Sequence, residues 1–182
     1  MTIRTKTLLV AAATAALSVG MFACGAPVKR PDGGVGLLPV GAIAPDVTGT
    51  DVKGHVSRLS DARGGRAVVF FYPKDETPGC TKEACAFRDA FTRYANAHVA
   101  LFGVSRDSDE SHQRFLSNHS LPFPLVADPE GTIERAYGVS STFAMSSRTT
   151  FLIAPDGRVE RVWPNVDPGV HADEVLAAAT TK

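Results

Sequence analysis

Neither acidic nor basic residues dominate this chain of 182 residues, which has 19 of each. There is no basic run either, so nothing in the sequence supports nucleic-acid binding. No glycine-rich phosphate loop, zinc-binding pattern or haem-attachment motif is present, and the five histidines have no metal-ligand spacing. The whole chain is 44% apolar and 21% charged. This is an ordinary soluble globular composition, and with this length it predicts one domain.

The first two dozen residues form a segment distinct from the rest of the chain. Arg4 and Lys6 precede an apolar stretch, which is the pattern of a secretory signal. Residues 21–25 resemble a bacterial lipoprotein cleavage site, in which Cys24 becomes the lipid-bearing first residue. We therefore expect a signal peptide over residues 1–23 and an exported, lipid-anchored membrane protein that faces the periplasm or the cell exterior.

Two alternatives for this segment stay open. Ordinary secretion, with cleavage after Ala23 or Ala26, would release the protein without a lipid. An uncleaved anchor would keep the apolar run, although that run is short for a membrane-spanning helix. Residues 24–40 are rich in glycine and proline and predict a flexible tether, so the folded domain is expected over residues 41–182.

The most informative part of the chain is residues 73–85, between a strand-like run over residues 67–72 and a helical pattern. Thr77 suits the N-cap of that helix and Pro78 its first position, so Cys80 lies in the first turn. The amides of a first turn are unpaired, and their aligned dipoles favour negative charge. A thiol there ionises more readily, and the thiolate is the reactive form, so we interpret the site as redox-active.

The helical spacing puts Cys80 and Cys85 on different faces. Cys80 shares an apolar stripe with Ala84 and Phe87, whereas Cys85 shares a polar stripe with Arg88, so Cys85 should be the more exposed. On a wound helix, residues five apart are separated by roughly 8.6 Å between Cα atoms, and a disulfide tolerates at most about 7 Å. The two sulfurs could therefore bond only if the first turns unwind. A structural disulfide, or a small buried cysteine, is the ordinary alternative.

Beyond this helix, strand and helix patterns alternate. Strands are expected over residues 99–105, 125–127, 149–153 and 158–163, helices over 109–118, 131–137 and 172–179, and an N-terminal hairpin over 46–50 and 55–57. Residues 140–147 are expected to form a polar loop. This order predicts an α/β domain with a central mixed sheet flanked by helices on both faces, and a reactive cysteine after a central strand fits the thioredoxin-like fold.

Three further groups could assist a reactive Cys80 thiolate. Arg148 immediately precedes the strand over residues 149–153, at the end of the sheet where Cys80 is expected, and it cannot lose its charge. The hydroxyl of Thr77 and the free first-turn amides of Gly79 and Cys80 are additional donors. A surface arginine at a strand edge is the alternative for Arg148.

With these residues the chain resembles a peroxiredoxin, most closely one of the bacterioferritin-comigratory (PrxQ) subfamily, over the whole expected domain. The family motif Pro-xxx-Thr-xx-Cys matches Pro73, Thr77 and Cys80. Cys85 falls on the resolving position of the subfamily, and Arg148 on the family arginine that precedes a Phe-Leu-Ile strand.

The resemblance implies a thiol-dependent peroxidase. Cys80 would attack hydrogen peroxide or an alkyl hydroperoxide and become a sulfenic acid. Cys85 would condense with it to a disulfide, which a thioredoxin-like dithiol reduces by exchange. Pro73 and Gly79 would line the substrate pocket. No metal, haem, flavin or other cofactor is implied, and because members of this subgroup are often monomers, a monomer is expected.

Two other classes of protein share this fold and export route. A thiol–disulfide oxidoreductase should carry Cys-x-x-Cys, and a copper-carrying thioredoxin-like lipoprotein should carry Cys-x-x-x-Cys and a distant histidine. Here four residues separate Cys80 from Cys85. No histidine stands out, since His112 and His119 are expected on a solvated helix face. Export also leaves the reductant open, because electrons outside the cytoplasm must arrive through a membrane-supplied relay.

Overall fold

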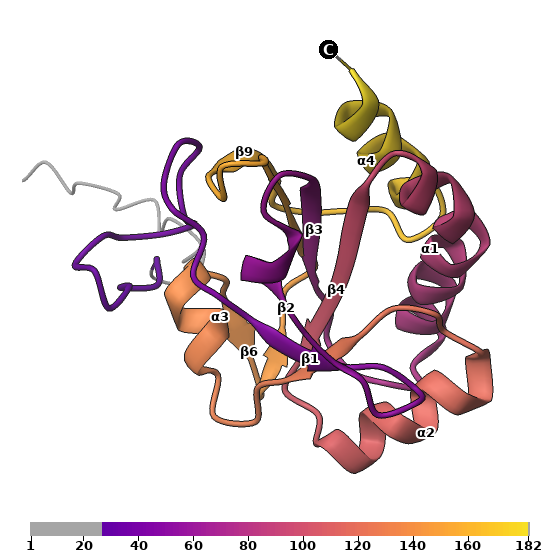
Figure 1. The fold of residues 1–182 in the computed structure, drawn as a ribbon. Coiled ribbons are helices and arrows are strands. Elements are labelled where there is room, and N and C mark those ends of the chain that lie inside the picture. Colours follow the sequence, from indigo (N-terminus) through magenta and orange to yellow (C-terminus); the bar gives the residue numbers. More distant parts are fainter. Residues whose placement is uncertain (1–26, 182) are drawn as a thin grey trace, which may run out of the picture.

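The computed structural model describes residues 27–181, and its central element is one mixed sheet with the strand order β2-β1-β5-β4-β3-β8-β9 (Figure 1). The strands are β1 (Thr48–Thr50), β2 (Val56–Arg58), β3 (Arg66–Phe71), β4 (Val99–Ser105), β5 (Leu125–Ala127), β8 (Thr149–Ile153) and β9 (Val159–Trp163). β3 is parallel to β4 and antiparallel to β8. The predicted mixed sheet is confirmed.

Helices cover both faces of this sheet. They are α1 (Pro78–Asn96), α2 (Asp109–His119), α3 (Thr132–Tyr137) and α4 (His171–Thr180), with a 3-10 turn, η1 (Leu59–Ala62). α1 and α4 lie together on one side of the sheet and α3 on the other (Figure 1). The predicted thioredoxin-like α/β fold is therefore confirmed, with helix boundaries within one residue or so of those expected.

Alternation along β3 and just beyond it fills two apolar cores. Val68, Phe70 and Tyr72 pack with α1 and α4, while Val69 and Phe71 point to the opposite face, because successive side chains of a strand point to opposite faces. On the side of α1 and α4, Phe70 stacks on the ring of Phe87 in α1, with the ring centroids 4.6 Å apart. This contact fixes α1, and with it the first turn that holds Cys80, on the sheet.

The register between β3 and β8 brings residues that are distant in sequence to the same end of the sheet. Phe71 lies opposite Thr149 in this antiparallel pair. Arg148 precedes β8, and Tyr72 follows β3, so both occupy the end of the sheet at which α1 begins.

Residues 28–38 differ from the predicted flexible tether. Arg30 is buried, and its Nη1 donates to the carbonyl oxygens of Gly36 (2.7 Å) and Leu37 (3.1 Å). Leu38 packs in the core, and its amide donates to the carbonyl of Tyr137 (2.9 Å). Residues 28–38 therefore pack against the domain that was expected to begin at residue 41, because this segment has its own apolar anchor and a buried arginine with hydrogen-bond partners.

The predicted signal peptide, residues 1–23, and the predicted lipidation site, Cys24, lie outside the described residues. None of the helices within residues 27–181 combines the length and the apolar character that a membrane span requires.

The expected polar loop over residues 140–147 contains a small hairpin. Its strands are β6 (Ser141–Thr142) and β7 (Met145–Ser146). Phe143 and Ala144 form the turn with φ of 51° and 57°, as the twist of a two-residue hairpin requires. Sequence did not indicate this turn, because the residues that favour such φ values are glycine, asparagine and aspartate.

The histidine that begins α4 is fully buried. His171 Nε2 lies 2.7 Å from the hydroxyl oxygen of Thr150, and its ring meets Phe87 and Trp163 edge-on. Among residues 27–181, its Nδ1 has no hydrogen-bond partner. Burial disfavours the charged ring and lowers the pKa of His171 to about 4.

This histidine is expected to make the protein sensitive to acid. Between the ordinary histidine pKa of about 6.5 and the folded value near 4, the unfolded state binds a proton that the folded state cannot. The free energy of unfolding should therefore fall as the pH drops through this window, by up to about 3 kcal/mol. Urea unfolding at pH 7.5 and pH 4.5 measures the loss, which should be smaller in His171→Gln. Equal losses in the two proteins would contradict the assignment.

Candidate active site

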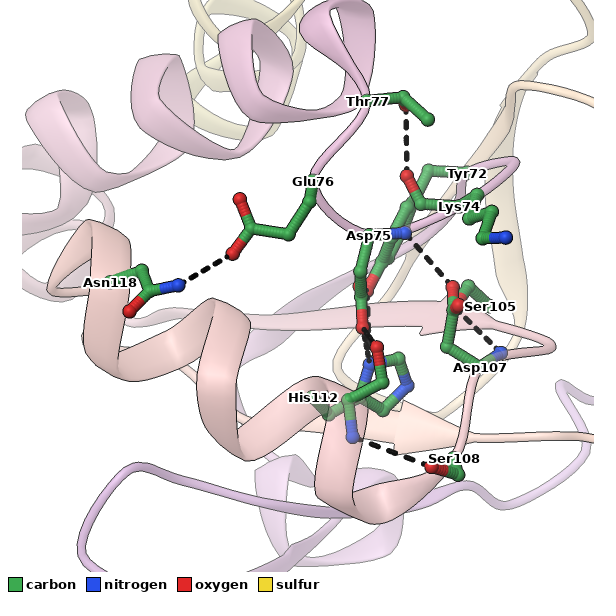
Figure 2. Close-up of polar contacts among 11 residues, drawn as sticks. Tyr72, Lys74, Asp75, Glu76, Thr77, Ser105, Asp107, Ser108, His112 and Asn118 are labelled. Atoms are coloured by element: carbon green, nitrogen blue, oxygen red, sulfur yellow. Dashed lines mark hydrogen bonds and ion pairs between the residues drawn. The ribbon is translucent and has the colours of Figure 1, made fainter.

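The loop between β3 and α1 delivers Cys80 to a helix start. α1 begins at Pro78, and Thr77 occupies the N-cap with extended backbone geometry, as predicted. The Thr77 side chain, however, does not cap a helix amide: its hydroxyl donates to the carbonyl oxygen of Lys74, 2.9 Å away (Figure 2). The hydroxyl oxygen therefore remains able to accept a hydrogen bond from a bound molecule.

Arg148 and Cys80 are in contact at the end of the sheet where α1 begins. Cys80 is 1% exposed and points into the core. Arg148 Nη2 donates to its sulfur over 3.2 Å. The guanidinium is permanently charged and donates in a fixed plane, so it can hold negative charge on the sulfur.

A buried carboxylate orients the arginine. Glu83 is 1% exposed, and its Oε2 accepts a hydrogen bond from Arg148 Nη1 over 2.6 Å. Its Oε1 has no hydrogen-bond partner in the part of the chain that the structure describes. Burial raises the pKa of Glu83 to about 7, against the lowering effect of Arg148. Sequence analysis missed Glu83. The available signal was its spacing of three residues from Cys80, which puts both side chains on one face of α1.

Gly79 leaves room for this arginine. A Cβ atom at position 79 would lie 2.7 Å from Arg148 Nη2, closer than real Cβ contacts come. The glycine predicted as a pocket residue thus serves the approach of Arg148 to the sulfur. Pro73, the other predicted pocket residue, lines a cavity of about 270 Å³ between the β3–α1 loop and the hairpin turn at Phe143.

Cys85 lies on the same helix and, like Cys80, is a free thiol. It is partly exposed, whereas Cys80 is buried, which agrees with the predicted faces. Because α1 is continuously helical through both residues, the geometric argument against a disulfide in the wound helix applies to this structure.

Two histidines predicted to be on a solvated face have partners in the loop before Cys80. His112 is 2% exposed, and its Nδ1 lies 2.9 Å from Asp75 Oδ2. His119 is only partly exposed, and its Nε2 lies 2.8 Å from Glu76 Oε2. The expectation of a solvated face is wrong for His112, because the β3–α1 loop packs over this side of α2.

Comparison with known proteins identifies a consistent set of relatives. Residues 40–162 match the AhpC/TSA family. The chain is 38% identical to peroxiredoxin Bcp of Bacillus subtilis over 146 residues, which cover 76% of this chain and 93% of that protein. It is 40% identical to the chloroplastic peroxiredoxin Q of Sedum lineare over 139 residues, which cover 75% of each.

Solved structures agree. Peroxidoxin BcpB from Mycobacterium tuberculosis aligns with a TM-score of 0.71 and 34% identity, over 78% of this chain and 96% of that one. Peroxiredoxin Q from Xanthomonas campestris aligns with a TM-score of 0.67 and 35% identity, over 73% of this chain and 89% of that one.

Proposed function

Because the chain belongs to the AhpC/TSA family, and within it to the thiol-dependent peroxidases of the Bcp/PrxQ peroxiredoxins, we propose that Cys80 is the residue that reduces hydrogen peroxide and alkyl hydroperoxides. The observation that carries this assignment is the 3.2 Å contact between Arg148 Nη2 and the buried sulfur at the start of α1. A cation and a helix N-terminus both favour the negative sulfur that attacks.

The site supplies what peroxide cleavage needs. The sulfur of Cys80 attacks one peroxide oxygen, the O–O bond breaks, and the other oxygen takes a proton and leaves as water or an alcohol. Cys80 becomes a sulfenic acid. The hydroxyl oxygen of Thr77 can accept a hydrogen bond from the peroxide O–H group while the Thr77 hydroxyl donates to the carbonyl oxygen of Lys74. Arg148 is placed to stabilise charge that develops on the oxygens.

Cys85 completes the cycle as the resolving thiol. Its sulfur attacks the sulfenic acid, water leaves, and a disulfide forms, after which a thioredoxin-like dithiol reduces this disulfide by exchange. Because the helix is wound through both cysteines, the first turns of α1 must unwind before this step. We expect the protein to work as a monomer, since both sulfurs belong to one helix.

A Cys85→Ser variant tests this function. The parent protein, supplied with thioredoxin and its reductase, should consume excess hydrogen peroxide continuously. Cys85→Ser should consume about one equivalent and stop as a sulfenic acid that dimedone traps, because the resolving thiol is gone. Continuous turnover of Cys85→Ser at the parent rate would contradict the role of Cys85. A parent protein that ignores peroxide would contradict the peroxidase itself.

We also propose that the protein is exported and carries a lipid on Cys24. The support is the sequence of residues 1–25, with its basic start, apolar stretch and cleavage-site pattern. Mass spectrometry of the N-terminus of the protein from its native membrane should find residues 1–23 removed and an acylated Cys24. An unmodified Cys24, or a chain that starts after Ala26, would contradict lipidation.

A further inference from the structure

A buried polar cluster lies beneath the loop that leads to Cys80. Its centre is Asp75, a loop residue that is 5% exposed (Figure 2). The hydroxyl of Tyr72 donates to Asp75 Oδ1 over 2.8 Å. The hydroxyl of Ser111 donates to Oδ2 over 2.8 Å, and His112 Nδ1 lies 2.9 Å from the same oxygen. Because an ionised carboxylate only accepts, the ring proton of His112 belongs on Nδ1.

The carboxylate of Asp75 is held ionised by these donors. Burial alone raises the pKa of Asp75, but the hydrogen bonds from His112, Ser111 and Tyr72 bring it below its ordinary value. Tyr72 and His112 are as deeply buried as Asp75. Removing one member therefore leaves buried polar groups without a partner, which is strongly unfavourable.

The backbone of the loop is tied to the same region. The amide of Asp75 donates to Asp107 Oδ2 over 2.9 Å, and the hydroxyl of Ser105 donates to that oxygen over 2.7 Å. The side chain of this loop residue is thus bonded to α2, and its backbone amide to the β4–α2 junction (Figure 2). Neither attachment is used in the peroxide chemistry described above.

The next residue marks where this attachment ends. The side chain of Glu76 meets Asn118 (2.9 Å) and His119 (2.8 Å) at the far end of α2. Its φ is 59°, a backbone conformation that is unusual outside glycine. After Glu76 the chain enters α1, whose first turns meet Arg148 instead. The boundary between the anchored loop and the helix that must unwind therefore falls at Glu76 and Thr77.

A fixed starting point matters for a helix that unwinds in each cycle. Every rewinding has to return the Cys80 sulfur to hydrogen-bond distance of Arg148, and displacements of about 1 Å in an active site can slow a reaction about 100-fold. We propose that Asp75 and His112 are positioning residues for the peroxidase reaction: they hold the loop that carries Thr77, so that Cys80 lies against Arg148 whenever α1 is wound. The inference rests on the proposed function.

The test compares two reagents on Cys80 as the only thiol. The parent is the full chain with Cys24→Ser and Cys85→Ser. The reaction of Cys80 with hydrogen peroxide requires hydrogen-bond donors in fixed positions around the sulfur. Alkylation by iodoacetamide requires only an accessible thiolate. His112→Leu should slow the reaction with peroxide about 10- to 100-fold and leave alkylation as fast or faster. His112→Asn, whose amide can donate from near the position of Nδ1, should recover most of the lost rate.

Matched controls separate positioning from loss of stability. His171→Leu removes another buried histidine, one that contacts Thr150 rather than the loop. Tyr94→Phe removes a buried hydroxyl bonded to the carbonyl of Ala172 over 2.6 Å, in parallel with Tyr72→Phe. We expect Tyr72→Phe to slow the peroxide reaction several-fold and both controls to keep the parent rate. The tyrosine pair decides the question if His112→Leu does not fold.

Three outcomes would overturn the inference. The first is a His112→Leu or Tyr72→Phe protein that reacts with peroxide at the parent rate. The second is an equal slowing of the reactions with peroxide and with iodoacetamide, and the third is a control variant that slows as much as its partner. Failure of the proposed function is recognised separately, because the parent would then react with peroxide no faster than free cysteine does.

Discussion

Replacing Cys80 with serine is expected to abolish peroxide consumption. The sulfur is the atom that is oxidised, and a serine hydroxyl neither ionises at neutral pH nor accepts an oxygen atom from a peroxide. Serine is nearly the size of cysteine and would still accept the hydrogen bond from Arg148, so the fold should persist. The rate should fall to that of peroxide in buffer.

The measurement is peroxide loss in the presence of thioredoxin and its reductase, with circular dichroism as a check on folding. The matched control is Cys85→Ser, since it loses the other sulfur of the same helix but keeps the first turnover. Catalytic consumption by a folded Cys80→Ser protein would show that the reacting atom lies elsewhere.

Replacing Arg148 with methionine should slow the reaction of peroxide with Cys80 by about 10²- to 10³-fold, the usual effect of removing a donor that faces developing charge. The guanidinium serves two partners at once, Cys80 Sγ and Glu83 Oε2. Arg148→Lys should recover little of the rate, because an ammonium group is a point charge that cannot reproduce the planar pair of donors.

The double variant Arg148→Met with Glu83→Gln separates the two contacts. Without Arg148, Glu83 would be a buried carboxylate with no counter-charge, and its pKa, already raised to about 7, would rise further. Adding Glu83→Gln should therefore restore much of the stability, measured by urea unfolding, without restoring the peroxide rate. If Glu83→Gln restored the rate as well, the effect of Arg148 would lie in folding and not at the sulfur.

Local patterns were sufficient for most of the fold and for part of the site. Alternation and length located the central strands, and Thr77 with Pro78 located the start of α1 within one residue. The place of Arg148 before a buried strand marked it as a candidate, and the resemblance to the family arginine assigned it to the site. Glu83 was missed because a charged residue on an apolar stripe looks like an exposed one until its partner is known.

Contacts between distant residues were beyond sequence reasoning. Asp75 and His112 are 37 residues apart, and only the packing of the loop on α2 brings them together. The hairpin turn at Phe143 has no glycine or asparagine to signal it. Arg30 and Leu38 stand in a segment whose composition indicates flexibility, although they anchor it to the domain.

Catalysis depends on the register in which β3 pairs with β8. Phe71 lies opposite Thr149, and a slip of one residue would turn Arg148 to the other face of the sheet, away from Cys80. A misaligned chain could keep its secondary structure and much of its apolar burial and still be inert. Specific activity per mole therefore reports the fraction of molecules in which β3 and β8 pair in the native register. Circular dichroism cannot measure this fraction, because it reports secondary-structure content.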